Sequence, residues 1–276
     1  MRKKRVLPGF GLSLGFTMLY MSLFVLIPLS IVFIQTSQLG WKKFAGVITS
    51  ERVLHSYQVS LTTSLVAAIV NAIFGLLIAW VLVRYTFPGK RLLDGLIDLP
   101  FALPTAVAGI TLTTLYAENG WVGKIFSVFH IKVAFTQLGI IIALTFIGLP
   151  FVVRMVQPVL QQSIDKEVEE AASSLGASRF QIFVKIILPE IFPALLAGFS
   201  LAFARALGEY GSVVFIAGNM PMKTEIAPLM IMTKLEQYDY AGATAVAAVM
   251  LIISLLFLLL INMIQTWSRR HELKSE

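Results

Sequence analysis

Long uncharged, apolar stretches alternate with short polar segments along the chain. Stretches without any Asp, Glu, Lys or Arg cover residues 6–41, 53–83, 99–117, 133–153 and 240–268. Between residues 191 and 215 the only charged side chains are Arg205 and Glu209. A helix that crosses a bilayer needs roughly 20 predominantly apolar residues. The pattern therefore predicts six transmembrane helices, near 12–34, 60–83, 97–116, 134–153, 191–217 and 241–264.

The composition supports an all-α integral membrane protein, which we interpret as one transmembrane domain over residues 1–276. Apolar residues make up 57% of the chain and charged residues 13%, whereas soluble domains carry about 25% charged residues. The start "MRKKR" and the apolar run after it resemble a signal peptide, but the run reaches Ile34 and no A-x-A site follows. We expect a retained first helix. The absence of cysteine excludes a Cys-ligated metal site.

The basic residues predict the orientation of the helices. With the N-terminus in the cytoplasm, 14 Lys and Arg residues fall in the inner loops and termini and 7 in the outer loops, with Arg205 inside a span. Such an excess follows the positive-inside rule. The sequence thus predicts a multi-pass protein with both termini in the cytoplasm. The net charge of +7 is attributed to this orientation and not to nucleic-acid binding.

The third predicted span carries two prolines close together. "DLPFALPTAVAG" places Pro100 and Pro104 four residues apart, just after Asp98. A single proline in a membrane helix is most often a packing kink, because neighbouring helices satisfy the freed backbone groups. Two at this spacing leave two interpretations open, namely packing kinks and a bent or broken helix that lines a path through the membrane.

The predicted cytoplasmic segment 154–190 is longer and more polar than a simple turn, and it contains "EEAASSLGASRFQIFVKIILPE" (169–190). Apolar residues recur there at helical spacing in two sets, Val168, Ala171, Ala172 and Leu175, then Phe180, Phe183, Val184 and Ile187. Between the sets, Gly176 is placed to end one helix. Ser178 and Gln181 form a capping box that starts the next, which we expect Pro189 to stop.

The acidic residues of this segment cluster at the start of its first helix. Glu167, Glu169 and Glu170 follow Asp165 there, where the helix macrodipole favours negative charge. The pattern alone is compatible with a helix pair lying on lipid headgroups and with a docking element for a cytoplasmic protein. Acidic residues argue mildly against anionic headgroups.

Arg205 and Glu209 are the two ionisable residues deep in a predicted span. A charge at the bilayer centre costs roughly 3 kcal/mol on insertion scales, and a spacing of four residues lets the two neutralise each other on one helix face. One interpretation is a buried pair that fixes helix packing. The other is a face that borders the translocation path, with Ser212 nearby and Arg205 offering positive potential to an oxyanion.

The chain carries no recognisable site for ATP or for an enzymatic reaction. A P-loop requires G-x-x-x-x-G-K-[ST], whereas Lys90 and Lys124 are followed by Arg91 and Ile125. The three histidines are dispersed, no H-E-x-x-H motif occurs, and Gly198-Phe199-Ser200-Leu201-Ala202 fails G-x-S-x-G at its last position. We therefore expect a non-enzymatic protein without a cofactor of its own.

The cytoplasmic segment resembles the EAA loop of ABC importer permeases. Glu170-Ala171-Ala172, three residues, Gly176, nine residues and then "IILP" at 186–189 match every fixed place of that motif. "DLPFALPTAVAGITL", "PFVVRMVQPVL", "GEYGSVVFIAGN" and "TEIAPLMI" resemble the sulfate/thiosulfate branch of the family, in particular its T-type subunit, over nearly the whole chain.

The resemblance implies a six-helix permease of the type I importer fold in the bacterial inner membrane. In that family the EAA loop forms a coupling helix seated in an ATPase subunit, which assigns the docking contact to the segment Glu169–Pro189, with Glu170, Ala171, Ala172 and Gly176 at its centre. ATP and Mg²⁺ are bound by a separate ATPase dimer. A second, homologous permease subunit and an extracytoplasmic sulfate-binding protein complete the importer, which works by alternating access.

Two other functions compete with sulfate or thiosulfate import. A molybdate or tungstate permease shares the Gly-Glu-aromatic-Gly element at Gly208–Gly211. A secondary anion transporter is compatible with the Arg205–Glu209 pair, but it leaves the cytoplasmic segment without a role. The path residues predicted for any of these functions are Pro100, Pro104, Arg205, Glu209 and Ser212.

Overall fold

The computed structural model describes residues 10–162 and 166–272, and in this part of the chain all regular structure is helical. Residues 2–5, Asp165 and Lys274, which entered the charge analysis, lie outside it. The helices are α1 (Phe10–Met21), α2 (Ile27–Ser37), α3 (Trp41–Ile48), α4 (Glu51–Arg84), α5 (Lys90–Ile97), α6 (Leu99–Ala102), α7 (Thr105–Tyr116), α8 (Trp121–Val128), α9 (Gln137–Gln162), α10 (Lys166–Ser174), α11 (Arg179–Ile182), α12 (Leu188–Leu207), α13 (Val213–Ile216), α14 (Ala227–Glu236) and α15 (Tyr240–Glu272). Two π-helical turns, Ser22–Leu26 and Phe183–Ile187, join α1 to α2 and α11 to α12.

Five helical segments of the described chain are long and apolar enough to cross a membrane. They are Phe10–Ser37, Glu51–Arg84, Gln137–Gln162, Arg179–Leu207 and Tyr240–Ile264. The predicted first, second and sixth spans lie inside three of them, and the fourth and fifth each overlap one. In the predicted span near 191–217 the helix ends at Leu207, because the backbone of Gly208 is no longer helical.

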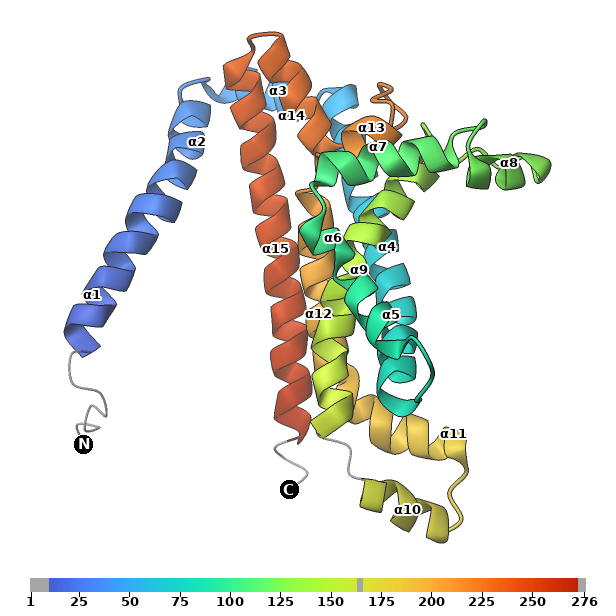
Figure 1. Cartoon of the computed structure of the whole chain (residues 1–276). Coiled ribbons are helices and arrows are strands. Elements are labelled where there is room, and N and C mark those ends of the chain that lie inside the picture. The colour runs from blue at the N-terminus through green and yellow to red at the C-terminus, as the bar shows by residue number, and fades with distance from the viewer. Residues whose placement is uncertain (1–9, 163–165, 273–276) are drawn as a thin grey trace.

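The third predicted span, near 97–116, is not one helix. The chain is extended at Leu103 and Pro104, so that α6 and α7 are separate helices. Figure 1 shows α5 running along the bundle and α7 crossing it. The break agrees with the interpretation of the two prolines, since Pro104 has no N–H to continue the helix and disfavours a helical conformation at Leu103.

The predicted loop 154–190 is shorter than expected, and Pro189 does not stop a helix. Helix α9 continues to Gln162, and Arg179–Leu207 is one helical segment that contains the π-turn. A regular α-helix would press the Pro189 ring against the carbonyl of Lys185, and the wider turn relieves this clash. The π-turn Ser22–Leu26 likewise ends two residues before a proline, Pro28.

The centre of the fold is the contact of α4, α9 and α12 around Val152. A Cβ on Gly75 of α4 would lie 2.7 Å from Val152 Cγ1, and a Cβ on Gly198 of α12 would lie 2.8 Å from Val152 Cα. Two glycines thus let both helices approach this valine of α9. In lipid, where apolar surface alone does not drive helices together, small residues at such contacts permit close packing.

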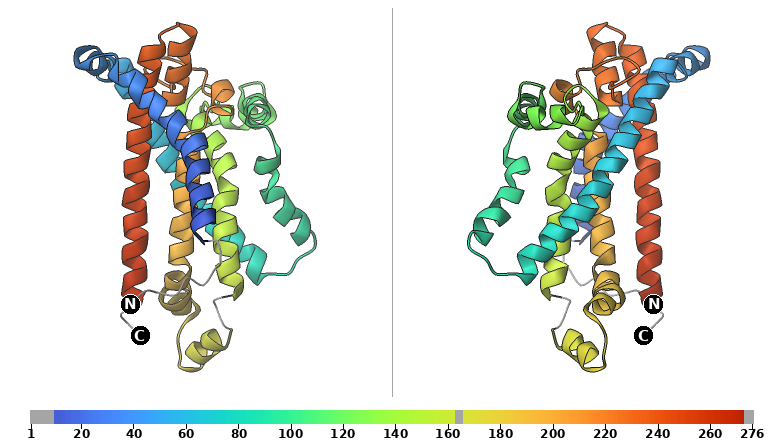
Figure 2. Two further views of the ribbon diagram at one scale, coloured as in Figure 1. Left: turned by 90° about the vertical axis from the view of Figure 1, so that its left-hand side faces the viewer. Right: turned by 90° about the vertical axis from the view of Figure 1, so that its right-hand side faces the viewer.

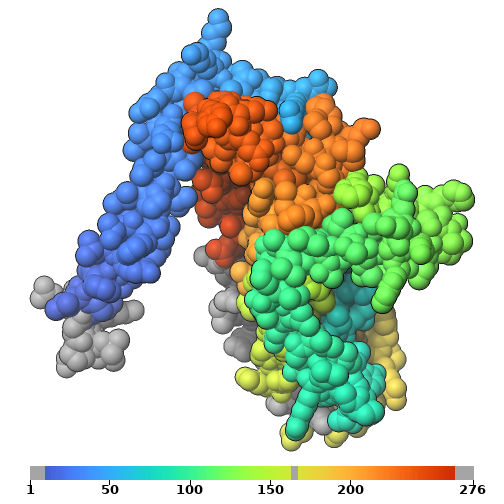
Figure 3. Space-filling model, turned by 45° about the horizontal axis from the view of Figure 1, so that its top comes forward, coloured from blue at the N-terminus to red at the C-terminus, as the bar shows by residue number. Residues whose placement is uncertain are grey.

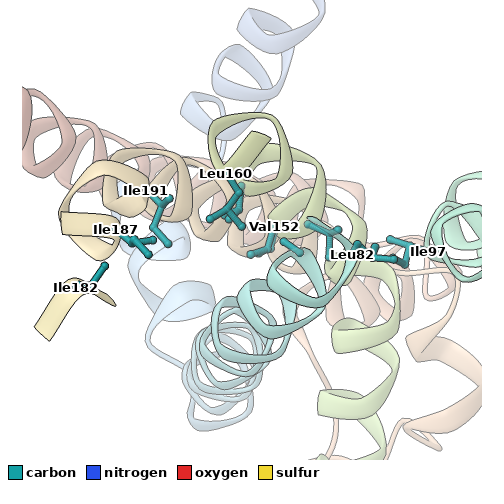
Figure 4. Close-up of a cluster of buried hydrophobic side chains, with 11 residues drawn as sticks. Leu82, Ile97, Val152, Leu160, Ile182, Ile187 and Ile191 are labelled. Carbon is teal, nitrogen blue, oxygen red and sulfur yellow. The ribbon is translucent and has the colours of Figure 1, made fainter. Parts of the chain in front are cut away.

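A buried apolar cluster, here called the basal cluster, continues this contact toward one end of the bundle (Figure 4). Its members are Ala79, Leu82, Ile97, Val152, Val153, Val156, Leu160, Ile182, Ile187, Ile191 and Ala202. Ala172 and Ala177, on either side of the turn after α10, pack against it. The polar segment is therefore anchored in the same core that holds the spanning helices.

In the part of the chain that the structure describes, the predicted inner and outer segments lie at opposite ends of the molecule (Figures 1 and 2). The end of α4, helix α10 and the end of α15 lie at one end, called the basal end, whereas α3, α8 and α14 lie at the other, called the apical end. Helices α1 and α2 bury none of their side chains, and α1 diverges from the bundle in Figure 3.

An arginine of α9 ties the broken third span to the bundle. Arg154 donates to both carboxylate oxygens of Asp98, at 2.8 and 2.7 Å, and to Asp94 Oδ1 at 2.7 Å. It also donates to the Asp94 carbonyl at 2.8 Å. Because Asp94 lies in the last turn of α5 and Asp98 directly follows that helix, this network fixes the junction of α5 and α6 in the limb that α5–α7 form at the edge of the bundle.

We predict that Gly75→Leu lowers the stability of the purified chain by roughly 1–3 kcal/mol, because the larger side chain forces α4 away from Val152. The midpoint of thermal unfolding in detergent measures the effect. Gly15→Leu is the matched control, since a Cβ there meets no atom within 4 Å. Equal midpoints for the two variants would contradict the role given to the Val152 contact.

Candidate functional site

The helix α10 and the turn after it project beyond the spanning helices at the basal end (Figure 1). Apolar side chains are unusually exposed there: Leu175 is 89% exposed and Phe180 74%. Glu170 and Ala171 are also exposed. Exposed apolar side chains beside a carboxylate, at the projecting end of the molecule, are suited to contact with another protein.

The turn that shapes this projection follows local backbone chemistry. The N–H of Ala177 donates to the Ala172 carbonyl at 3.0 Å, and the N–H of Gly176 to the Ser173 carbonyl at 3.0 Å. These two bonds form a Schellman motif, whose C′ residue takes a left-handed conformation. Gly176 has φ +85°, and a Cβ there would meet no atom. The glycine is needed for its conformation and not for space.

The capping box predicted after this turn is confirmed. Ser178 Oγ accepts from the Gln181 N–H at 3.3 Å, and Gln181 Oε1 accepts from the Ser178 N–H at 2.8 Å. The apolar face predicted for the second helix is wrong in part. Phe180 is exposed, and the buried positions are Ile182, Ile187 and Ile191, because the π-turn brings residues five apart onto one face.

The structure divides the residues predicted for docking into two groups. Glu170 and Ala171 face outward, whereas Ala172 is half-buried against the basal cluster. The Glu169 carboxylate forms an ion pair with Arg84, at the end of α4. Pro189 lies further along the chain, in the first turn of α12. Arg84 was not among the predicted site residues, because 85 positions separate it from Glu169 and no local pattern connects them.

The predicted intramembrane pair is present, although its geometry differs from the prediction. Helix α12 ends at Leu207, so Arg205 and Glu209 do not share a helix face. The Arg205 guanidinium still forms an ion pair with Glu209. Glu209 Oε1 accepts from the N–H of Ser212 at 2.9 Å and from its Oγ at 3.1 Å. The Glu209 side chain is 2% exposed and that of Arg205 is 37% exposed.

The break in the third span lies against this polar turn. A Cβ on Gly109 would lie 2.4 Å from the Ser212 carbonyl oxygen, and a Cβ on Gly211 would lie 2.1 Å from Thr105 Oγ1. The structure thus brings the start of α7, which follows Pro104, into contact with the segment after α12. Pro100 lies on the other side of the break, in the first turn of α6.

A second long-range arginine pair lies at the apical end. Arg52, in the first turn of α4, donates from Nε and Nη2 to the two carboxylate oxygens of Glu225 at 2.7 and 2.8 Å. Glu225 is 1% exposed. The partners are 173 positions apart, so no local sequence pattern could predict this pair either.

Comparison with known proteins assigns the class of this fold. The family described as "Binding-protein-dependent transport system inner membrane component" matches residues 71–272, and the chain belongs to this family. It is therefore a multi-pass membrane component of an ABC transport system, and its role is transport rather than catalysis.

Individual relatives carry names from sulfate transport. Over 263 residues, 95% of each chain, the sequence is 52% identical to the sulfate transport system permease protein CysT of Salmonella typhimurium. It is 49% identical to CysT of a Synechocystis strain over 255 residues, which cover 92% of this chain and 89% of the relative. The predicted resemblance to the T-type sulfate permeases is thereby confirmed.

A solved structure shares the fold at low sequence identity. In the crystal structure of a bacterial alginate ABC transporter in complex with an alginate pentasaccharide-bound periplasmic protein, one chain superposes with a TM-score of 0.74. The identity is 18%, and the match covers 92% of each chain. This likeness confirms the all-helical permease fold.

We predict that Glu209→Ala destabilises the chain by roughly 2–3 kcal/mol, because it leaves Arg205 without its counter-charge and the buried Ser212 N–H without an acceptor. Glu209→Gln keeps an acceptor for Ser212 and should have about half this effect. The midpoints of thermal unfolding compare the two. If the glutamine variant is as unstable as the alanine variant, the Ser212 hydrogen bonds contribute nothing to the fold.

Proposed function

We propose that this chain is the membrane-spanning permease subunit of an ATP-driven importer for sulfate and thiosulfate. The observation that carries the proposal is 52% identity, along 95% of the chain, to a sulfate transport system permease, combined with a projecting helix–turn–helix element that carries the complete EAA pattern. The whole of residues 1–276 would act as one permease domain.

The orientation proposed for the chain places the basal end in the cytoplasm. The segments predicted to be inner carry 14 Lys and Arg residues and those predicted to be outer carry 7, and the described inner segments, among them the end of α4 and α10, lie at the basal end. Positive residues are retained on the cytoplasmic side of a membrane. Both termini and α10 would then be cytoplasmic, and α3, α8 and α14 would face an extracytoplasmic sulfate-binding protein.

The exposed surface of α10, of the turn after it and of α11 would dock on a separate ATPase dimer, which binds ATP and Mg²⁺. Leu175 and Phe180 supply apolar area, Ala171 permits close approach, and Glu170 supplies a charge-assisted hydrogen bond or ion pair. Closure of the ATPase dimer would move α10, and a second, homologous permease subunit would complete the pathway for alternating access.

The anion would pass the exposed side of Arg205. Glu209 is enclosed and neutralises much of the Arg205 charge, while more than a third of the arginine side chain remains exposed. The pair thus presents its cationic side to the adjoining space. Partial neutralisation suits a conduit, because an ion that is held too tightly does not leave.

The docking surface predicts that Glu170→Lys and Gly176→Pro abolish association with the ATPase while the chain still inserts in the membrane. The first reverses the exposed charge, and the second is incompatible with a positive φ. Co-purification of the ATPase with the tagged permease measures docking. Glu236→Lys, an exposed glutamate of the apical end, is the control and should retain the ATPase. Normal recovery with both basal variants would remove the docking role.

A double variant tests the role of Arg205 in transport, because it removes both members of the ion pair and leaves no buried charge unpaired. In Arg205→Gln/Glu209→Gln both charges are removed together, so the complex should assemble while sulfate uptake falls about tenfold or more, as expected for the loss of a fixed positive potential. Uptake of labelled sulfate into cells lacking the native chain provides the measurement. Full uptake by the double variant would leave the pair with a structural role alone.

The same uptake assay distinguishes the competing substrates and mechanisms. We expect unlabelled thiosulfate to compete with sulfate and molybdate to compete weakly or not at all. Stronger competition by molybdate would favour the molybdate or tungstate permease. Undiminished uptake after depletion of ATP, with the ion gradients maintained, would favour a secondary transporter.

A further inference from the structure

Two adjacent glutamates of the EAA segment have different surroundings. Glu170 is exposed on α10, whereas the Glu169 side chain is 22% exposed and its carboxylate accepts a hydrogen bond from Arg84 Nη2. Among the described residues this is the one side-chain hydrogen bond that joins α10 to a spanning helix. Glu169 is therefore engaged inside its own chain.

Arg84 is held in place by the surrounding protein. Its guanidinium carbon lies 5.0 Å from the centre of the Trp80 ring, one turn earlier on α4. The Arg84 side chain is 19% exposed, and its Nε is buried without a hydrogen-bond partner in the described part of the chain. An enclosed guanidinium depends on its carboxylate partner more than a solvated one does, because water cannot replace the lost interaction.

The preceding turn of α4 contacts the segment that follows α10. The ring of Trp80 meets the ring of Phe183 edge to face, with centroids 5.5 Å apart. Phe183 is the first residue of the π-turn that leads into α12. Trp80, Phe183 and Ala172 all pack against the basal cluster. The last two turns of α4 thus touch both sides of the projecting element.

Helix α4 is suited to carry a displacement along the bundle. It is 34 residues long and contains no proline, whereas α9 and α12 each contain prolines. At 1.5 Å per residue it spans about 50 Å. An arginine ion pair fixes each end: Arg84 with Glu169 at the basal end, and Arg52 with Glu225 at the apical end. Movement of α10 would therefore reach the apical end through one uninterrupted helix.

We propose that Arg84 is a positioning residue, which through Glu169 locks α10 to α4 so that the two move together during transport. The inference rests on the proposed function, because it assumes that an ATPase displaces α10. It removes Glu169 from the docking contact and leaves that contact to Glu170 and its exposed neighbours. Loss of the lock uncouples ATP hydrolysis from import without releasing the ATPase.

Charge reversal tests the lock in the assembled complex. In Arg84→Glu and in Glu169→Arg, sulfate uptake should fall about tenfold, the size expected for the loss of one coupling interaction. The amount of co-purified ATPase should stay at the wild-type level. The exchange variant Arg84→Glu/Glu169→Arg should recover at least half of the uptake. Arg91→Ala, an exposed arginine of the same end without an ion pair in the described chain, is the matched control.

The outcomes separate this inference from the proposed function. If the wild-type complex recruits the ATPase and imports sulfate, but the single reversals import normally or the exchange restores nothing, the lock is refuted while the importer stands. If wild-type chain neither recruits the ATPase nor imports sulfate, the proposed function fails. If Glu169→Arg releases the ATPase as Glu170→Lys does, Glu169 belongs to the docking surface and the lock is again refuted.

A second experiment replaces the ion pair by a covalent link and so does not depend on the exchange variant. The chain contains no cysteine, so Arg84→Cys/Glu169→Cys carries the only two thiols of this subunit. We expect low uptake before treatment and recovery of at least half after bridging by a short bifunctional maleimide. Bridging that leaves uptake low, or that blocks the uptake remaining before treatment, would show that the two segments must separate during transport, and would overturn the proposal.

Discussion

The position of Val152 between two glycines is the contact on which the rest of the architecture depends. Lipid tails are as apolar as the helices themselves, so α4, α9 and α12 gain little by hiding apolar surface and gain stability through close packing. Gly75 and Gly198 supply that closeness on both sides of one valine. The basal cluster extends from this point to the turn after α10, and the orientation of the projecting element therefore follows from the packing of the spanning helices.

The low dielectric of the membrane then determines how the charged residues are arranged. Buried charges in membrane proteins are paired or hydrogen-bonded, because no water is present to solvate them. Arg52, Arg84, Arg154 and Arg205 each have a carboxylate partner. Two of these pairs join edge elements to the bundle. Arg154 holds the limb of α5, and Arg84 holds α10. Electrostatic pairing thus fixes the elements at the edge of the bundle, whereas glycine contacts fix its centre.

Features that depend on local chemistry were predictable from the sequence. The break at Leu103 and Pro104, the glycine turn at Gly176 and the capping box at Ser178 each follow from a few neighbouring residues, and the structure contains all three. The stop expected at Pro189 was wrong, because a π-turn accommodates the proline and allows the helix to continue.

That π-turn also explains the error in the predicted apolar face. An extra residue in one turn shifts the helical repeat, so a count at α-helical spacing selected Phe180 where the structure buries Ile182. The ion pairs of Arg84 and Arg52 were not predictable for a different reason. Their partners are 85 and 173 positions away, and only the assembled bundle brings them together.

The interruption between α6 and α7 has a consequence for hydration. The last carbonyls of α6 and the first amides of α7 have no partners within their own helices. Acyl chains offer no hydrogen bonds, so backbone of this kind is tolerated at membrane depth only against other protein or beside water. The chain around Leu103 therefore cannot face lipid. In the working transporter this place must be enclosed by a neighbouring subunit or wetted, and an aqueous space that reaches it would extend well below the membrane surface.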